Sequence, residues 1–220
     1  MPYSLDEFHR QYDTDIQEIS IAGRRYRFYL PASIERFINA EDPLQDFPLW
    51  AKIWQAGVVL AGHMAELPPE NGRRILEIGA GIGLAGIVAA DHGHRVRLTD
   101  FNADAMNFAR ANAALNGCTD VEVAALDWRR PGPADACDML IGSEVIYKEE
   151  DVDILLALFA ACLKPGGRIV LAEEVRKTLD PFLKSASRTY RLGIRRFQLR
   201  SENETSTVVL IELRSRDTHQ

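Results

Sequence analysis

The chain has 220 residues, of which 46% are hydrophobic and 26% charged, so it can bury the core of a folded domain and is unlike a disordered chain. Its net charge of −6 argues against non-specific binding to nucleic acid or to an anionic membrane, because both need a basic surface. The three cysteines have no metal-ligand spacing and are typical of reduced thiols. No signal peptide and no membrane-spanning run is expected. We therefore expect a cytoplasmic protein without a metal site.

The first 48 residues are expected to form an extension packed on the domain that follows. Residues 1–18 are polar with scattered aromatic side chains, which suits a short helix or an arm. Alternating apolar residues over Glu18–Leu30 predict a hairpin with its turn at Ala22 and Gly23. A short helix is predicted over Pro31–Ala40.

A long helix is predicted over Leu49–Leu67, because apolar residues recur at helical spacing until two prolines end the pattern. Trp50 and Trp54 are four residues apart and would share one face of that helix. We expect Trp50 to lie in the core.

From Arg73 onward, predicted strands alternate with predicted helices. The strands are expected over 73–78, 95–99, 120–125, 137–142, 168–173, 193–200 and 205–213, and the helices over 84–92, 103–116, 150–163 and 178–189. Regular alternation predicts an α/β fold, a doubly wound, mostly parallel sheet with right-handed crossovers. The last two strands read as a closing hairpin. No linker is visible, so residues 49–215 are expected to form one domain.

A glycine-rich turn follows the first strand of this alternation. Glycines 79, 81 and 83 remove Cβ atoms where the chain turns sharply and where a ligand would touch backbone N–H groups at a helix N-terminus. Residues 81–86 also fit the dinucleotide pattern G-x-G-x-x-G, but that match alone is weak. Glu77 directly before the turn would repel a pyrophosphate. A turn that only packs the helix on the strand is the structural alternative.

The segment from Glu77 to Gly83 instead resembles the E-x-G-x-G-x-G motif of class I, seven-strand methyltransferases, which use S-adenosylmethionine (SAM). A carboxylate suits SAM, whose methionine end carries an ammonium group and whose sulfur is cationic.

Acidic and aromatic residues follow the next two strands. Asp100 stands where a carboxylate can accept both ribose hydroxyls of a nucleoside. It could instead cap the next helix, although Asn102 is available for that role. After the third strand, Asp127 can accept the adenine amino group and Trp128 can lie against the adenine. A tryptophan that fills the core is the alternative.

Glu144 and Tyr147 lie three residues apart just past the fourth strand and would face the methyl group. A helix-start acid and a packing tyrosine explain the same spacing equally well.

The whole set resembles methyltransferase family 16, which includes many protein-lysine methyltransferases. The similarity runs from about residue 45 to 175 and covers the Leu49–Trp54 segment, the glycine turn, Asp100, Asp127-Trp128 and Ser143–Tyr147. The family's acidic-x-x-Tyr motif appears here with Glu144 where many members carry Asp. The resemblance implies a Rossmann-like seven-stranded sheet with an antiparallel C-terminal strand. The expected SAM-binding residues are Trp54, Glu77, Gly79, Ala80, Gly81, Gly83, Asp100, Phe101, Asp127, Trp128 and Ser143.

The expected function is methyl transfer from SAM to a lysine side-chain amine of a protein. Glu144 would attract and orient the ammonium, and Tyr147 would accept a hydrogen bond from it or offer its ring face. A small amine or another metabolite is the alternative acceptor, and a non-catalytic SAM-binding protein is a third possibility. An NAD-dependent oxidoreductase is disfavoured by Glu77 and by Asp127-Trp128. No nucleic acid or membrane partner is expected, and the oligomeric state stays open.

Overall fold

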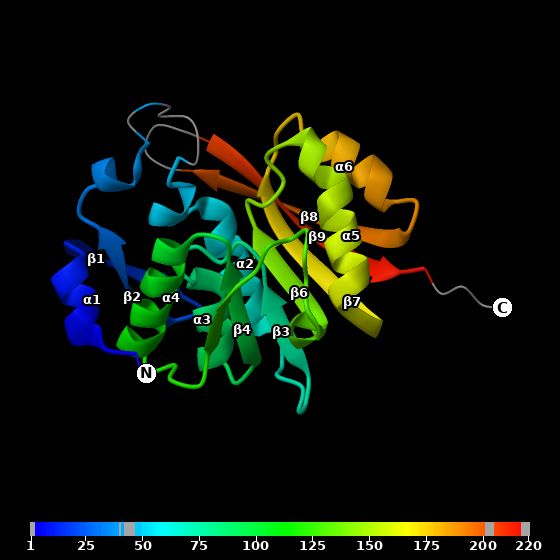
Figure 1. Ribbon diagram of the computed structural model, residues 1–220. Helices are drawn as coiled ribbons and strands as arrows, with labels where there is room; N and C mark the ends of the chain where they lie inside the picture. Colours follow the sequence, from blue (N-terminus) through cyan, green and yellow to red (C-terminus); the bar gives the residue numbers. More distant parts are fainter. Residues whose placement is uncertain (1–2, 40, 42–46, 201–204, 217–220) are drawn as a thin grey trace.

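A seven-stranded sheet forms the centre of the molecule. The computed structural model describes residues 3–39, 41, 47–200 and 205–216. The sheet has the order β5-β4-β3-β6-β7-β9-β8, and β9 alone runs antiparallel to its neighbours (Figure 1). Its strands are β3 (Arg74–Glu77), β4 (Arg95–Asp100), β5 (Glu122–Ala125), β6 (Cys137–Ser143), β7 (Leu163–Glu174), β8 (Tyr190–Arg200) and β9 (Thr205–Ser215). The doubly wound, mostly parallel sheet with an antiparallel C-terminal strand is therefore confirmed.

Helices cover both faces of this sheet. One face carries α2 (Gln55–Glu66), α3 (Leu84–Asp91) and α4 (Ala103–Leu115), and the other carries α5 (Val152–Cys162) and α6 (Leu179–Ala186). Strands covered on both faces bury successive side chains, which explains why β3 and β6 read as continuous apolar runs rather than as alternating ones. Single 3-10 turns, η3 (Pro133–Asp135) and η4 (Glu149–Asp151), precede β6 and α5.

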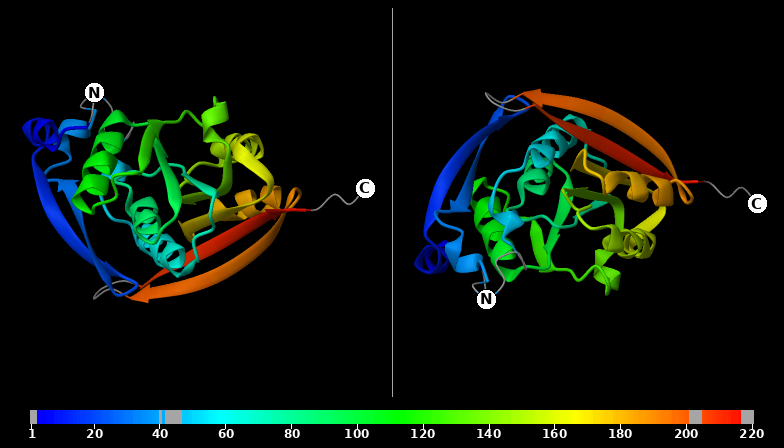
Figure 2. Two further views of the ribbon diagram at one scale, coloured as in Figure 1. Left: turned by 90° about the horizontal axis from the view of Figure 1, so that it is seen from below. Right: turned by 90° about the horizontal axis from the view of Figure 1, so that it is seen from above.

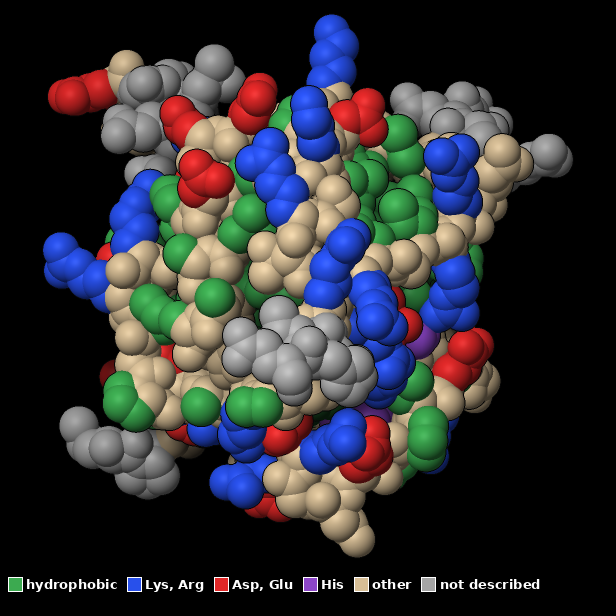
Figure 3. All heavy atoms as spheres, turned by 90° about the vertical axis from the view of Figure 1, so that its right-hand side faces the viewer, with side chains coloured by type: hydrophobic (Ala, Val, Ile, Leu, Met, Phe, Trp, Pro, Cys, Tyr) green, Lys and Arg blue, Asp and Glu red, His purple; other side chains and the backbone are tan. Residues whose placement is uncertain are grey.

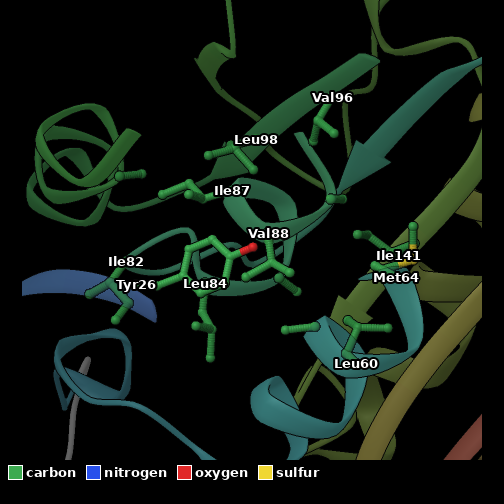
Figure 4. Close-up of a cluster of buried hydrophobic side chains, with 14 of the residues drawn as sticks. Tyr26, Leu60, Met64, Ile82, Leu84, Ile87, Val88, Val96, Leu98 and Ile141 are labelled. Carbon is green, nitrogen blue, oxygen red and sulfur yellow. The ribbon is translucent and has the colours of Figure 1, made fainter. Parts of the chain in front are cut away.

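The core consists of one apolar cluster on each face of the sheet. Figure 4 shows part of the first, which includes Leu60 of α2, Val88 of α3, Leu98 of β4 and Ile141 of β6 together with Tyr26. Each such side chain contributes about 1.5–3 kcal/mol when it is fully buried. Tyr26 belongs to the N-terminal hairpin, so that hairpin shares this core.

The N-terminal segment forms α1 (Leu5–Gln11) and a hairpin of β1 (Thr14–Ile21) and β2 (Arg24–Pro31). The predicted turn at Ala22 and Gly23 is confirmed, since both have the positive φ that a two-residue hairpin turn requires. Strand β1 starts four residues before the predicted hairpin. Figure 2 shows this hairpin and the β8–β9 hairpin converging on one side of the molecule. The boundary between residues 48 and 49 stays a prediction.

The single long helix predicted over Leu49–Leu67 is wrong. The chain forms a 3-10 turn, η2 (Leu49–Ala51), then runs extended, and α2 begins only at Gln55. The cause is tertiary: the backbone of Trp50 lies directly against the glycine turn, where a Cβ on Gly81 would come within 3.3 Å of the Trp50 carbonyl oxygen. In the predicted helix over 31–40, only η1 (Glu35–Phe37) is helical, and residue 40 is outside the described part of the chain.

Within the described parts of the chain, no helix combines the length and the apolar character that crossing a bilayer requires.

Candidate active site at the strand ends

The predicted site residues follow the carboxyl ends of four adjacent strands. The chain proceeds from β3 outward to β4 and β5, then returns to β6 on the other side of β3. The strand order thus reverses between β3 and β6, and this is where open α/β sheets bind ligands. The glycine turn follows β3, Asp100 ends β4, Asp127 follows β5, and Ser143 ends β6.

The glycine turn is held in a conformation that favours glycine. Gly81 and Gly83 have φ values of 54° and 88°, in the left-handed region that other residues adopt at a cost. A Cβ on Gly83 would also lie only 3.0 Å from Ile87 and 3.1 Å from Leu98. The turn is fastened by a hydrogen bond from the Ala80 N–H to the Thr99 carbonyl, 2.9 Å. Strand β3 and helix α3 therefore approach closely, with Ala80 and Gly81 just beyond the carboxyl end of β3.

Glu77 lies beneath the turn rather than over it. Its side chain is buried, with 2% exposed, and its Oε2 accepts the Gly86 N–H of α3 at 2.9 Å. Burial raises the pKa of Glu77 to about 8, and the charge of Asp100 adds to the increase. The structure thus shows Glu77 holding α3 against β3. Its predicted contact with the methionine end of SAM stays a prediction.

Asp100 connects β4 to the glycine turn. Its Oδ2 accepts the Gly81 N–H and its Oδ1 accepts the Asn102 N–H, each at 2.9 Å. Burial raises the pKa of Asp100, while these backbone N–H groups act in the opposite direction. Asn102 caps α4 by accepting the Ala105 N–H, which confirms the predicted cap, and the role of Asp100 toward a ribose stays a prediction.

Phe101 is the most exposed of the large apolar side chains in the described residues, with 79% of its surface accessible. It follows Asp100 at the end of β4. An exposed aromatic ring beside a largely buried carboxylate is a combination that a nucleoside can use, since the ring can stack on a base.

The two predicted cofactor-binding tryptophans, Trp128 and Trp54, differ in what they contact. Trp128 is half-buried, and a Cβ on Gly79 would lie 3.7 Å from its Cζ2 atom, so the ring borders the turn. Asp127 accepts the Arg129 N–H within its own loop, at 2.9 Å. The described contacts of Trp54 are also local. Its indole N–H donates to the Leu49 carbonyl at 2.6 Å, and the Lys52 ammonium lies 3.5 Å from the ring centroid.

Trp50 packs against the aromatic ring of Phe108 in the core, with ring centroids 5.3 Å apart, as predicted. Ser143 lies where the first turn of α2 meets the end of β6, because a Cβ on Gly57 would come 3.5 Å from its Oγ. Asp100 and Trp128 therefore both lie next to the glycine turn. The described side-chain contacts of Trp54 are with Leu49 and Lys52 of its own segment.

Glu144 faces β7 instead of open space. It is a non-glycine residue with a φ of 54°, its Oε1 accepts the Glu174 N–H at 2.9 Å, and its Oε2 forms an ion pair with Arg176. Burial raises the pKa of Glu144, and the charge of Arg176 opposes that effect. Both oxygens of this carboxylate thus already have partners. The predicted contact of Glu144 with an acceptor ammonium would have to replace the ion pair with Arg176.

Tyr147 combines an exposed ring with a desolvated hydroxyl. The side chain is 41% exposed, yet burial raises the pKa of the phenol well above its usual value. The charges of Asp100, Glu173 and Glu144 raise it further. These three acidic side chains come from β4, the end of β7 and the loop after β6, so the Tyr147 hydroxyl lies in an acidic environment.

Sequence reasoning missed Glu173. It is buried, with 2% exposed, and its carboxylate accepts the N–H groups of Val145 and Ile146, at 2.9 and 3.4 Å. Burial raises the pKa of Glu173 to about 8, and the charge of Glu144 adds to the increase. It thereby holds the loop between Glu144 and Tyr147. The available signal was an acidic residue at the carboxyl end of an otherwise apolar strand.

Two surface hollows of about 410 and 350 Å³ lie away from the strand ends and share Tyr3 and Arg110 as lining residues. They border α4, and no residue of the glycine turn and no predicted site residue lines them. We therefore place the candidate active site at the strand ends. In the described part of the chain, no group of three or more His, Cys, Asp or Glu side chains could hold a metal ion.

Comparisons with known proteins agree with this geometry. A family model described as lysine methyltransferase matches residues 39–189. The protein N-lysine methyltransferase METTL21A of Xenopus tropicalis is 32% identical over 164 residues, which cover 70% of this chain and 76% of that protein. The histone-arginine methyltransferase METTL23 of Mus musculus is 33% identical over 115 residues, 48% of this chain and 44% of that protein.

Solved structures show the same fold. The N-methyltransferase NodS of Bradyrhizobium japonicum, in complex with S-adenosyl-L-homocysteine, has a TM-score of 0.60 and 18% identity, and the match covers 84% of this chain and 97% of that one. The TYW2 protein of M. jannaschii, in complex with SAM, has a TM-score of 0.61 and 19% identity, covering 93% and 88%. This chain therefore belongs to the lysine methyltransferase family, and it is a methyltransferase that uses SAM.

Proposed function

We propose that this methyltransferase transfers a methyl group from SAM to a lysine side-chain amine of a protein substrate. The observation that carries the proposal is the family match over residues 39–189, together with a relative named a protein N-lysine methyltransferase. Asp100 supports it, because this acid is the charged group that acts most on Tyr147, and a negative charge there favours a cationic acceptor over an anionic one.

The residues at the strand ends fit SAM. In this proposal, the Asp100 carboxylate accepts hydrogen bonds from the ribose, since each of its oxygens retains a lone pair beyond the backbone bond that it accepts. The exposed ring of Phe101 and the indole of Trp128 would cover the adenine, with Asp127 accepting its amino group. The remaining proposed neighbours of the cofactor are Trp54, Glu77, Gly79, Ala80, Gly81, Gly83 and Ser143.

SAM supplies an activated methyl group on a cationic sulfur. What the chain must add is an aligned and deprotonated acceptor in a site that excludes water. A free lysine has a pKa of about 10.4, and desolvation in a narrow site would lower it. The raised pKa of Tyr147 keeps its hydroxyl protonated at neutral pH. Tyr147 is therefore proposed as a hydrogen-bond partner that orients the amine, and not as a general base.

Glu144 is proposed mainly to hold the loop that carries Tyr147 in place, and not to contact the acceptor. Its ion pair with Arg176 and its bond to the Glu174 N–H join the loop after β6 to the end of β7. The direct role toward the acceptor ammonium, predicted from the sequence, would require this ion pair to open. A Glu144→Gln variant would retain most of the hydrogen bonding and lose the charge.

An arginine acceptor is the second candidate, and one observation favours it. The relative METTL23 is named a histone-arginine methyltransferase and matches 115 residues of this chain. The lysine relative matches a longer part of the chain, and we therefore prefer lysine. A small amine or another metabolite on the same scaffold is the third acceptor class.

Incubation of the protein with methyl-labelled SAM and a cell lysate tests the proposal. We expect label on protein, and mass spectrometry of the labelled peptides should place it on lysine. Label on arginine would favour the second candidate, and label only in the small-molecule fraction would contradict a protein substrate.

Tyr147→Phe should lower the rate of transfer while SAM binding, measured by thermal shift, stays near that of the parent. Phe101→Ala should weaken SAM binding about tenfold, the loss of one stacking partner.

We also propose that the protein acts in the cytoplasm. The three cysteines, Cys118, Cys137 and Cys162, are free thiols in the structure, as a reducing compartment would keep them. Recovery of the chain from a secreted or periplasmic fraction would contradict this location.

A further inference from the structure

The charges of this acidic protein are unevenly distributed along the chain. Residues 175–200 contain eight Lys and Arg and a single acid, Asp180, which gives the segment a net charge of +7. The whole chain carries −6, so the remaining residues carry the difference, −13. A block of one sign in a chain of the other sign is typical of an interaction surface rather than of folding needs.

The fold exposes this block on one side of the molecule. The segment contains α6 and β8, and β8 is the edge strand of the sheet. Figure 3 shows Lys and Arg side chains running as a band over the side that faces the viewer. We call the exposed Lys and Arg side chains of residues 175–200 the basic face. They are Lys177, Lys184, Arg188, Arg191, Arg195 and Arg196.

Neighbouring strands add to the positive charge. The register pairs Arg191 of β8 with Arg214 of β9, and Arg214 with Arg168 of β7, so three arginines stand in one row across the sheet. Like charges directly opposite one another are destabilising. Glu212 offsets part of this charge through contacts with Arg214 at 2.7 Å and Arg168 at 3.8 Å. The row therefore keeps an excess of positive charge that an anionic partner would neutralise.

Most of the basic face lacks partners of its own. Among the described residues, no ion pair is formed by Lys184, Arg188 or Arg191. Within the part of the chain that the structure describes, Arg195 lies 2.8 Å from a ring nitrogen of His63 and over the face of Phe197. These cations are thus available to a ligand from outside the chain.

The basic face begins at the active site. Arg176, the first basic residue of the segment, pairs with Glu144, and the Thr178 hydroxyl donates to the Ile146 carbonyl at 2.9 Å. The start of the basic segment is therefore fastened to the loop that presents Tyr147. Helix α6 begins three residues after Arg176 and carries Lys184, so a chain bound along α6 toward Arg176 would reach the loop that presents Tyr147.

We propose that the basic face binds an acidic, Asp- and Glu-rich segment of the protein substrate and so delivers a nearby lysine to the strand-end site. This inference rests on the proposed function, since it assumes a protein acceptor. A protein segment is favoured over nucleic acid because the charge of −13 on the rest of the chain would repel a long polyanion, whereas a short acidic segment meets only the basic face.

Binding of a fluorescein-labelled decaglutamate peptide, measured by fluorescence anisotropy, tests the proposal without any methyl transfer. The test variant combines Lys184→Glu, Arg188→Glu and Arg191→Glu. The matched control combines Arg10→Glu, Arg25→Glu and Arg95→Glu, three exposed arginines outside the basic face, with the same change in net charge. We expect the parent and the control to bind the peptide, and the test variant to bind at least about tenfold more weakly. Binding by the parent should also weaken as salt is added.

The same variants are then compared in the labelled-SAM lysate experiment. The test variant should transfer label to protein more slowly than the control, while its SAM-induced thermal shift equals that of the parent. If the test variant does not fold, Lys184→Gln, Arg188→Gln and Arg191→Gln replace it, with the same direction and a smaller effect.

Equal peptide binding by the test and control variants, or equal transfer rates, would overturn the docking proposal while leaving lysine methylation intact. Tighter binding of a single-stranded DNA 20-mer than of decaglutamate, through the same residues, would overturn it in favour of nucleic acid. Loss of protein labelling in the parent, with peptide binding retained, would instead count against the proposed function.

Discussion

Two buried carboxyl groups, Glu77 and Glu173, fasten α3 and the loop after β6 at the border of the site. Glu77 accepts the Gly86 N–H in the first turn of α3, and Glu173 accepts two N–H groups of the loop after β6. Burial raises the pKa of each to about 8. At neutral pH these groups favour the protonated form in the folded protein, so the stability of the site depends on pH.

Replacing Glu173 by glutamine should reduce that dependence. Between pH 5 and 8 the folded protein keeps the Glu173 proton and the unfolded chain releases it, so the free energy of unfolding falls as pH rises. One such group contributes a slope of roughly 1 kcal/mol per pH unit in this window. Glu173→Gln cannot ionise, and urea unfolding at pH 5.5 and 7.5 should show a smaller decline than in the parent.

The exposed Glu18 of β1 provides a control, because Glu18→Gln should leave the parent's slope unchanged. A Glu173→Gln variant whose stability declines with pH as steeply as the parent's would mean that Glu173 is ionised in the folded protein.

Gly86 shows how tightly α3 packs on the sheet. A Cβ at this position would collide with Leu98 and with the Glu77 carboxylate, and would lie 3.1 Å from Val96. Gly86→Ala should therefore lower the free energy of unfolding by about 1–3 kcal/mol through overpacking. Gly62 in α2 has no atom within 4 Å of its Cβ position, so Gly62→Ala should raise stability by about 0.5–1 kcal/mol. Thermal unfolding that moves in the same direction for both variants would contradict this account.

Sequence patterns predicted the backbone positions of the site better than the directions of its side chains. The glycine spacing and the Asn102 cap depend on local chain geometry, and both are found where expected. The ion pair of Glu144 with Arg176 and the bonds of Glu173 join two strand ends that are about 30 residues apart in the chain. No local pattern encodes such a contact, so the acidic-x-x-Tyr spacing alone could not reveal that Glu144 is already paired.

At the level of elements, the N-terminal hairpin is joined to α4 through two asparagines. The side-chain amide of Asn112 bonds both the N–H and the C=O of Tyr29, at 2.6 and 3.2 Å, and Asn116 does the same for Arg27, at 3.1 and 2.7 Å. Four residues along a helix advance about 6 Å, and two residues along a strand advance about 6.6 Å. The spacing of Asn112 and Asn116 along α4 therefore matches the spacing of Tyr29 and Arg27 along β2. The two side-chain amides supply hydrogen bonds to the edge of β2 that is not paired with β1.

Removing the two amides separately should have unequal effects. Asn112 is fully buried and also donates to the Ile82 carbonyl in the glycine turn, at 3.0 Å. Asn112→Ala removes the partner of one buried and two part-buried backbone groups, and we expect a loss of roughly 2–4 kcal/mol in the free energy of unfolding. Asn116→Ala, closer to solvent, should cost about 1 kcal/mol. Equal losses in urea unfolding would show that the turn gains nothing from Asn112.

Element types were predicted correctly wherever burial on both faces or a glycine boundary defined them, as in β3, β6 and α4. The segment Leu49–Trp54 failed because its apolar spacing suits a helix, whereas the backbone of Trp50 has to pass over Gly81. Trp54 starts α2 without a side-chain cap. The glycine turn after β3 imposes this backbone path on Trp50. The spacing of apolar residues within 49–54 carries no information about that contact.

At the scale of the whole molecule, the N-terminal hairpin and the sheet share one core. Phe8, Tyr26 and Phe28 are buried in the same cluster as Leu98 of β4 and Val208 of β9, two strands in different halves of the sheet. A segment that contributes buried side chains to the shared core is expected to unfold with it rather than before it.

Calorimetry should therefore show one unfolding transition for the whole chain. SAM at one hundred times its dissociation constant should stabilise the folded state by about 2.7 kcal/mol and raise the temperature of that one transition by roughly 5–10 °C. Phe28→Ala, which removes a fully buried ring of the hairpin, should lower the same transition by a comparable or larger amount, since a buried phenylalanine contributes about 3–5 kcal/mol. Ile16→Ser on the same hairpin, where the side chain is 52% exposed, should leave it nearly unchanged. If the Phe28→Ala variant instead shows two transitions, with SAM moving only the upper one, the hairpin folds independently of the methyltransferase core.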